Sequence, residues 1–174
     1  MAAEPVRDSE TVTPAGEQKR ALPHGVVLRD IQTHVDDRGI VFELFDTRWG
    51  AHPDPMVFSY CFTIRPGKIK GWGVHREHDD RYAMLFGEMK VVLYDDRPNS
   101  PTCGLVSEVM LTEHRRQLFT IPAGVWHANQ NIGAKDTVTV NFPTIQYDHS
   151  NPDKYRLPLD TDQIPYRFAD SSGW

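Results

Sequence analysis

Turn residues recur so often along this chain that they leave no room for long helices. Clusters such as Arg65-Pro66-Gly67 and Pro122-Ala123-Gly124 combine proline and glycine. Proline fixes the φ angle and glycine allows angles that other residues avoid, so both are common in tight turns. The 174 residues include 13 prolines and 12 glycines, and no helical period lasts for more than about two turns. Many short segments between turns are typical of antiparallel sandwiches or barrels, so the sequence predicts an all-β fold.

The segments between the turns are rich in Val, Ile, Phe, Tyr and Thr, which favour strands. Thr137–Phe142 alternates strictly between polar and apolar residues, which is typical of a strand with one buried face. The expected strands are Val26–Ile31, Ile40–Asp46, Met56–Ile64, Lys68–His75, Tyr82–Phe86, Met89–Asp95, Leu105–Leu111, Gln117–Ile121 and Thr137–Phe142.

Both ends of the chain differ from this pattern. Residues 1–23 are rich in Ala, Glu, Thr, Pro and Gly without an apolar period, which predicts a flexible N-terminal arm. Residues 169–174 are small and polar apart from Trp174, and they predict a short C-terminal tail. We therefore expect one domain over residues 24–168, which is an ordinary length for a single domain.

Charge and composition argue against several classes of partner. The net charge of −5 disfavours a nucleic-acid partner, and no apolar run is long enough to cross a membrane. The two cysteines, Cys61 and Cys103, are too few for a disulfide framework, and no secretion signal is visible. The sequence thus predicts a cytoplasmic protein that binds neither nucleic acid nor membranes.

The sharpest motif runs from Pro122 to Asn131 and reads P-x-G-x-x-H-x-x-x-N. It resembles the second motif of the cupins, which are antiparallel barrels of the jelly-roll or double-stranded β-helix type. In this motif the Pro-x-Gly turn aims the next strand into the barrel. We therefore expect His127 to point inward, where an imidazole can bind a metal or an organic ligand.

The first cupin motif is present only in part. Between Gly67 and Gly87, the positions of the second histidine and of the carboxylate hold His75 and Asp80. Gly73 stands where the first histidine is expected. The sequence therefore retains a two-histidine, one-carboxylate set with His127 but has lost one ligand of a complete metal cupin.

Two interpretations of these histidines remain open. His75, Asp80 and His127 could hold a divalent metal, with His78 as a third imidazole from the adjoining loop. Alternatively, His75 and His127 bind an organic ligand without metal. The cofactor prediction is that the protein has none, with a divalent metal on His75, His78, Asp80 and His127 as the alternative.

Several stretches together resemble the dTDP-4-dehydrorhamnose 3,5-epimerase family of cupins, over most of Val26–Pro165. The resemblance implies a nucleotide-linked 4-keto-6-deoxy sugar in the barrel, proton removal next to the ketone, and a homodimer. The stretches that carry it are Asp37-Arg38-Gly39 with Phe42-Glu43, Gly67-Lys68-Ile69-Lys70-Gly71, Gly87-Glu88, Leu93–Arg97, Ser100–Gly104 and Ile121–His127.

The departures from the family fall at its catalytic positions. Aligned from Gly67, the family's base histidine lands on Gly73, and His75 follows two residues later on the same face of a strand. The family's substrate-side lysine lands on Asp80, or on Arg81 if the alignment slips by one.

The family's catalytic tyrosine and its supporting aspartate have no direct counterpart. The tyrosine lands near Asn141-Phe142, neither of which is a phenol, and Tyr147 is a possible substitute a few residues later. The C-terminal aspartate that supports the base in the family finds no clear match. Epimerisation beside a ketone needs a base and an opposing acid, and Tyr147, Tyr82 and Tyr60 are the candidate acids.

Candidate roles follow from these matches and departures. His75 is the expected base, and Arg38 and Lys70 lie where the family holds phosphate. Strict alternation places Lys70 and Trp72 on the strand face away from His75 unless a bulge intervenes. The catalytic candidates are His75, His127, Asp80 and Tyr147, and the substrate-binding candidates are Arg38, Glu43, Lys70, Arg81, Tyr82 and Asn141.

Three functions compete. The first is a divergent epimerase or isomerase acting on a dTDP-linked 4-keto-6-deoxy sugar, with His75 as base. The second is a metal-dependent cupin enzyme that uses His75, Asp80 and His127. The third is a non-catalytic sugar-binding cupin, which the missing tyrosine, lysine and aspartate favour. The retained histidines place the enzyme first.

Overall fold

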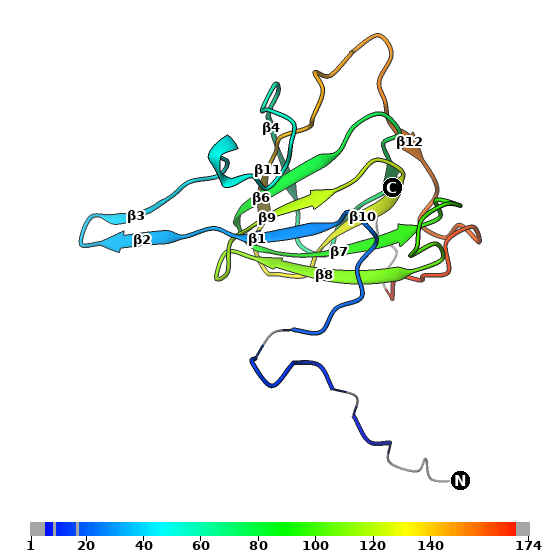
Figure 1. Cartoon of the computed structure of the whole chain (residues 1–174), viewed down its shortest axis with the longest axis horizontal. Coiled ribbons are helices and arrows are strands. Elements are labelled where there is room, and N and C mark those ends of the chain that lie inside the picture. The colour runs from blue at the N-terminus through cyan, green and yellow to red at the C-terminus, as the bar shows by residue number, and fades with distance from the viewer. Residues whose placement is uncertain (1–5, 9, 17, 170–174) are drawn as a thin grey trace.

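The structure, a computed structural model, describes residues 6–8, 10–16 and 18–169. Two five-stranded antiparallel sheets face each other (Figure 1). The first sheet has the order β1 (Val27–Asp30), β9 (Gln117–Ile121), β6 (Asp80–Phe86), β11 (Thr137–Asn141) and β4 (Tyr60–Ile64). The second has the order β12 (Tyr155–Arg156), β5 (Ile69–Val74), β10 (Val125–Asn131), β7 (Glu88–Asp95) and β8 (Val106–Thr112). The prediction of an antiparallel all-β fold is confirmed.

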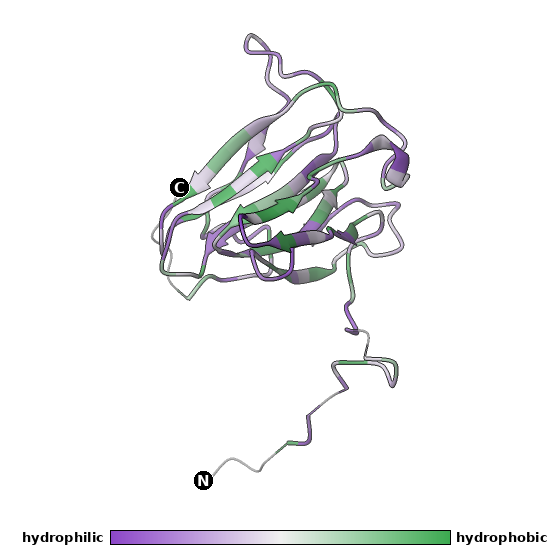
Figure 2. Cartoon of the chain, turned by 90° about the vertical axis from the view of Figure 1, so that its left-hand side faces the viewer, coloured by the Kyte–Doolittle hydropathy of each residue, from purple (hydrophilic) through white to green (hydrophobic). Residues whose placement is uncertain are grey.

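The main core lies between the two sheets. Strands β6 and β9 of the first sheet contribute Tyr82 and Phe119, and β7 of the second contributes Val91 and Leu93, all of them buried. Full burial of such a side chain stabilises the fold by about 1.5–3 kcal/mol. Figure 2 shows hydrophobic residues concentrated in the strands and hydrophilic ones in the loops.

The outer face of each sheet is also covered. The segment before β4, which includes Phe45 in ring contact with Phe142, packs over the first sheet. The segment after β12 packs over the second sheet, where Ile164 is fully buried and Phe168 contacts the ring of Trp72. Coverage on both faces explains why β7 reads as a nearly continuous apolar run instead of an alternating one.

A two-stranded hairpin projects from this body (Figure 1). It pairs β2 (Thr33–Asp36) with β3 (Gly39–Phe42), and a short 3₁₀ turn, η1 (Thr47–Trp49), follows it. Strand β2 was not among the expected strands, because only Val35 in it has an apolar side chain. The short β12 was missed for a similar reason, while β10 was expected only as the strand that carries His127.

The described part of the N-terminal segment leads away from the sheets (Figure 1), and the chain joins the body near Ala21, whose carbonyl accepts a bond from Ser107. Of the tail expected over residues 169–174, residues 170–174 lie outside the described residues. None of the described helices is both long and apolar enough to span a membrane.

Candidate active site

A bulge in β5 determines which of its side chains face the interior cavity. His127 of β10 pairs with Gly73, but Asn129 pairs with Lys70, so two steps on β10 match three on β5. The extra residue reverses the alternation. Lys70 therefore lines the same cavity as Gly73 and His127, while Trp72 is buried in the outer core. Strict alternation predicted that Lys70 and Trp72 both face away from His75. This prediction is wrong for Lys70 and right for Trp72.

Two adjoining cavities open beside this bulge, each of about 130 Å³. This is room for a sugar ring and less than the usual 300–1,000 Å³ of a site for a drug-sized ligand. Tyr60 and Lys154 line both cavities. The first is otherwise lined by Phe62, Lys70, Gly71, Gly73, Tyr82, His127, Asn129 and Arg156. The second is otherwise lined by His75, Glu77, His78, Pro143, Ile145, Gln146, Tyr147, Asp148, Asn151 and Asp153.

Three imidazoles surround the buried carboxylate of Asp80. His75 Nε2 lies 3.4 Å and His127 Nε2 3.5 Å from Asp80 Oδ2, and His78 Nε2 lies 3.8 Å from Oδ1. The rings of His75 and His78 have their centroids 4.1 Å apart. The structure therefore brings together the four residues that the two cupin motifs and their adjoining loop supply.

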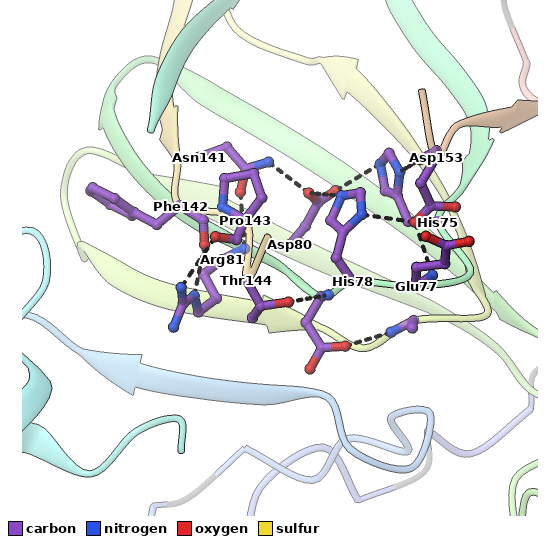
Figure 3. A network of polar contacts seen from close by, with 12 residues as sticks. His75, Glu77, His78, Asp80, Arg81, Asn141, Phe142, Pro143, Thr144 and Asp153 are labelled. Carbon is purple, nitrogen blue, oxygen red and sulfur yellow. Dashed lines mark hydrogen bonds and ion pairs between the residues drawn. The ribbon is translucent and has the colours of Figure 1, made fainter. Parts of the chain in front are cut away.

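The other nitrogen of each ring is held by an oxygen. The Nδ1 atom of His75 faces the carbonyl of Asp153, and that of His78 lies 2.8 Å from the Asp153 carboxylate (Figure 3). His127 Nδ1 lies 3.2 Å from the carbonyl of Val125. These contacts place the Nδ1 proton of each neutral ring, so that Nε2 turns toward Asp80.

Charge is distributed unevenly within the cluster. Burial opposes the ionisation of Asp80, yet the neighbouring His75 and His127 hold the pKa of this carboxyl well below its usual value. Burial opposes the charged form of His75 as well, but Asp80 raises the net pKa of His75. Burial lowers the pKa of His127 to about 4, so His127 is neutral at pH 7. The best-formed ion pair is thus His75 with Asp80.

The donor set also fits a divalent metal. The contacts of 3.4–3.8 Å around Asp80 are long for hydrogen bonds, and they approach the roughly 3.3 Å that separates two ligands of a tetrahedral ion. Ligand atoms of His75, His78 and Asp80 lie within 4.8 Å of one another. His75 Nε2 is buried and has no hydrogen-bond partner among the residues that the structure describes. His75, His78 and Asp80 are the residues that would hold such an ion, and His127, the fourth ligand of the predicted metal alternative, lies 3.5 Å from Asp80 but outside this group.

Asn141 and Tyr82 support the cluster from β11 and β6. Asn141 donates a bond of 2.6 Å to Asp80 Oδ1 and one of 3.0 Å to the hydroxyl of Tyr60. Tyr82 donates from its hydroxyl to Asp80 Oδ2 at 3.2 Å. Tyr82 lines the first cavity, as a substrate-binding residue should, whereas Asn141 lines neither cavity and orients Asp80 and Tyr60 from behind.

Arg81 lies away from the cavities, contrary to the substrate contact expected of it. Its side chain is fully buried on the opposite face of β6 from Asp80. The guanidinium donates to four backbone carbonyls, which belong to Asp54, Pro55, Phe142 and Pro143. With its donors used in this way, Arg81 holds loops together and does not reach a ligand.

Arg38 and Glu43 are also remote from the cavities of their own chain. Arg38 lies at the tip of the β2–β3 hairpin, where it pairs with Asp36 (Figure 1). Glu43 follows β3 and is exposed. Neither residue lines either cavity, so the contact with phosphate expected of them is not made within one chain.

The sequence argument missed Lys154, Arg156 and Asp153. All three come from the segment around β12, which pairs with β5 through Tyr155 and Arg156. Lys154 and Arg156 bring positive charge to the cavities, and Asp153 orients two histidines. The charged spacing Asp-Lys-x-Arg was visible, but nothing in it indicated pairing with a strand some 80 residues earlier.

Comparison with known sequences identifies relatives over most of the chain. A model of the dTDP-4-dehydrorhamnose 3,5-epimerase family matches residues 21–164. The probable low-salt glycan biosynthesis epimerase Agl13 of Haloferax volcanii is 36% identical over 138 residues, which are 79% of this chain and 88% of that protein. The spore coat polysaccharide biosynthesis protein SpsL of Bacillus subtilis is 32% identical over 146 residues, covering 83% and 95%.

Solved structures give the same fold. A dTDP sugar isomerase from Desulfovibrio desulfuricans superposes with a TM-score of 0.79 and 25% identity, over 87% of this chain and 98% of that one. A 3,5-epimerase from Legionella pneumophila, solved with dTDP-4-keto-L-rhamnose, has a TM-score of 0.72 and 20% identity, over 85% and 80%. The barrel is therefore the cupin fold that the two motifs predicted, and the chain belongs to the dTDP-4-dehydrorhamnose 3,5-epimerase family.

Proposed function

We propose that this protein is an epimerase or isomerase that acts on a dTDP-linked 4-keto-6-deoxy sugar. The observation that carries the proposal is the pair of adjoining cavities, with Lys70 and Arg156 lining one, and His75, the partner of Asp80, lining the other. A nucleotide sugar has the matching parts, a diphosphate and a sugar ring with acidic C–H bonds beside a ketone. Family membership supports the same class of substrate.

The first cavity suits the diphosphate and the polar edge of the sugar. Lys70 and Arg156 bring two positive charges there, and charge-assisted contacts with phosphate are strong. Asn129 adds a buried carbonyl oxygen with no hydrogen-bond partner among the described residues. A sugar hydroxyl would satisfy this acceptor, whose burial is otherwise costly.

The second cavity suits the proton transfer. His75 lines it and has Asp80 as its partner, so an imidazole there can take a proton from the carbon beside the ketone. Tyr147 lines the same cavity and Tyr60 lines both, which makes these phenols the candidates for the opposing acid. Burial and the charge of Asp80 raise the pKa of Tyr60 to about 12, so Tyr60 keeps its proton at neutral pH.

Hydrogen exchange tests the proposal directly. The protein is mixed with dTDP-4-keto-6-deoxyglucose in deuterated buffer, and proton NMR follows the signals at the carbons beside the ketone. We expect enzyme-dependent exchange at one or both carbons, reduced about 100- to 10,000-fold in His75→Ala. His114→Gln, which changes an exposed histidine outside the cavities, should exchange as the wild type does.

The same experiment separates the enzyme from a non-catalytic binding protein. Binding of dTDP without exchange at saturating ligand would exclude the proton-transfer mechanism and leave a sugar-binding cupin as the function. Repeating the assay with a panel of 4-keto sugars shows whether a lack of exchange holds for other sugars as well.

A metal-dependent cupin enzyme is the second candidate, favoured by the long contacts around Asp80 and by the Nε2 of His75, which makes no hydrogen bond with the described residues. A bound ion would polarise a carbonyl oxygen of the substrate. Elemental analysis of protein purified without chelator should then give about one metal per chain, lost in His78→Ala and in His127→Ala. Metal-free protein that still exchanges the substrate proton would remove this candidate.

A homodimer is part of the proposal, because one chain leaves the site incomplete. The two cavities offer places for the sugar ring and the diphosphate and leave the nucleoside outside. The β2–β3 hairpin exposes Val35, Ile40 and Val41 and carries Arg38 at its tip. Docking of this hairpin on a second copy would bury the apolar side chains and bring a cation toward the partner's cavity. We place the protein in the cytoplasm, where nucleotide sugars are made and used.

A further inference from the structure

Lys154 stands at the junction of the two cavities, in the space beside Gly73. A Cβ atom on Gly73 would lie 3.9 Å from Lys154 Cε and 3.8 Å from His127 Nε2. Lys154 lines both cavities, whereas Lys70 and Arg156 line only the first. The amine on this side chain is therefore the cation nearest the place where a sugar ring would meet the histidine cluster.

The backbone holds Lys154 in this place on both sides. Asp153 accepts bonds from the amides of Arg76 and Glu77 and faces the rings of two histidines (Figure 3). Tyr155 and Arg156 pair with Val74 and Gly73 in the β12–β5 ladder. Alternation along the segment then turns Lys154 and Arg156 to the same side. The side chain is thus presented by anchored backbone and not by a free loop.

The ammonium of Lys154 has no fixed partner in the part of the chain that the structure describes. No ion pair or hydrogen bond among the described residues engages it, whereas Arg81 and Arg97 are each used on carbonyls or on a carboxylate. Desolvation, together with the charges of Arg156 and Lys70, lowers the pKa of Lys154 below its ordinary value. The nearby Asp80 opposes this change. Lys154 is therefore available to a ligand, and a negatively charged group would stabilise its positive form.

Proton removal beside a ketone creates such a negative group. When a base takes the proton, the C–H electron pair forms a C=C bond, and the carbonyl π pair moves onto oxygen as an enolate. Returning a proton to the opposite face of the carbon re-forms the C=O bond, so the step consumes no other reactant. A fixed cation at the oxygen stabilises the charge that develops in the transition state.

We propose that Lys154 is a catalytic residue whose ammonium binds the 4-keto oxygen and stabilises the enolate. This inference rests on the proposed epimerase function and deepens it. The histidine cluster then removes the proton, and Lys154 keeps its own proton throughout. Lys70 and Arg156 remain for the diphosphate, because they line the first cavity alone.

The test compares Lys154→Met, Lys154→Arg and the exposed control Lys135→Met. Two quantities are measured for each: the exchange rate of dTDP-4-keto-6-deoxyglucose in deuterated buffer, and the dissociation constant of dTDP alone by calorimetry. We expect Lys154→Met to slow exchange about 100- to 1,000-fold while dTDP binding changes less than about 3-fold. Lys154→Arg, which keeps the charge, should recover a large part of the lost rate, and Lys135→Met should match the wild type.

Each of the other possible outcomes would overturn one part of the proposal. Exchange at the wild-type rate in Lys154→Met would overturn the role of Lys154 and leave the epimerase function standing. Equal losses of exchange and of dTDP affinity would make Lys154 a phosphate-binding residue instead. A Lys154→Arg variant as slow as Lys154→Met would make it a base. Absence of exchange in the wild type would overturn the proposed function itself. Retained dTDP binding shows that a variant is folded, and circular dichroism shows the same for a variant that binds dTDP weakly.

Discussion

Gly71 and Ala128 lie in direct contact between β5 and β10: a Cβ on Gly71 would stand 2.4 Å from the Cβ of Ala128. Gly71 also has a φ of 152°, in a region that side chains rarely adopt. Two residues later the situation differs, because a Cβ on Gly73 would meet nothing nearer than 3.8 Å. The bulge that turns Lys70 into the cavity therefore depends on a glycine at 71 and not on one at 73.

Alanine substitutions at Gly71 and Gly73 should show that the bulge needs a glycine at position 71 and that the cavity wall does not need one at position 73. We expect Gly71→Ala to lower the free energy of unfolding by about 1–3 kcal/mol or more, because the new methyl group cannot fit beside Ala128. Gly73→Ala should change it by less than about 0.5 kcal/mol. Urea denaturation of both variants checks this, and equal losses would show that the two positions are under the same constraint.

Arg81 should act on stability and not on ligand recognition. Replacing it with methionine leaves four carbonyls without their donor, of which those of Phe142 and Pro143 are buried. Each buried unsatisfied group costs about 1–3 kcal/mol, so we expect Arg81→Met to lower the free energy of unfolding by at least about 2 kcal/mol in urea denaturation. Arg115→Met, which removes an exposed ion pair with Asp30, should lose less than about 1 kcal/mol. A stable Arg81→Met protein with weakened dTDP binding would restore the substrate role expected from the sequence.

Motif spacing was enough to assemble the centre of the site. Turns and alternation predicted the antiparallel fold, and the two cupin motifs predicted that His75, Asp80 and His127 meet, because each lies at a fixed distance from a glycine turn. Lys70 could not be placed in this way, since a bulge depends on how two strands pair, which one strand alone does not show.

The errors at Arg81 and Lys154 have one cause, which is that distant parts of the chain decide where each side chain lies. Arg81 looks like an exposed cation in the sequence, but the loops near Asp54 and Pro143 close over it. Lys154 looks like a surface lysine, yet β12 brings it to the cavities. Long-range pairing of this kind leaves no local pattern, so the cations of the site were the residues hardest to predict.

The β2–β3 hairpin should govern oligomeric state. If its exposed apolar side chains dock on a second copy, light scattering after size exclusion should give twice the mass of the chain for the wild type. Val41 is 70% exposed in one chain, and Val41→Lys places a charge at this position. The variant should therefore have the mass of one chain. Val6→Lys, which changes an even more exposed valine in the N-terminal segment, should give the same mass as the wild type. A Val41→Lys protein with unchanged mass would exclude the hairpin as the interface.

Asp95 should make stability depend on pH. This buried carboxylate ends β7 and accepts bonds from Arg97 at 2.8 and 2.9 Å and from the hydroxyls of Ser100 and Thr102 at 2.6 Å. Burial opposes its charge, but these donors hold the pKa of Asp95 well below the usual value for an aspartate. The unfolded chain therefore takes up a proton at a higher pH than the folded one, so the stabilisation is complete above about pH 5 and falls as the pH drops through 4. Removing one partner of such a pair leaves the other uncompensated, so Asp95→Asn should cost about 3–5 kcal/mol at pH 7.

Urea denaturation at pH 7, 5 and 3.5 measures how this cost depends on pH. The difference between wild type and Asp95→Asn should narrow at pH 3.5, because only in the wild type does the unfolded chain gain stability there by protonating residue 95. The exposed Asp136→Asn is the control and should follow the wild type at every pH. A constant gap between wild type and Asp95→Asn over this range would mean that Asp95 contributes through shape and hydrogen bonds, with no part for its charge.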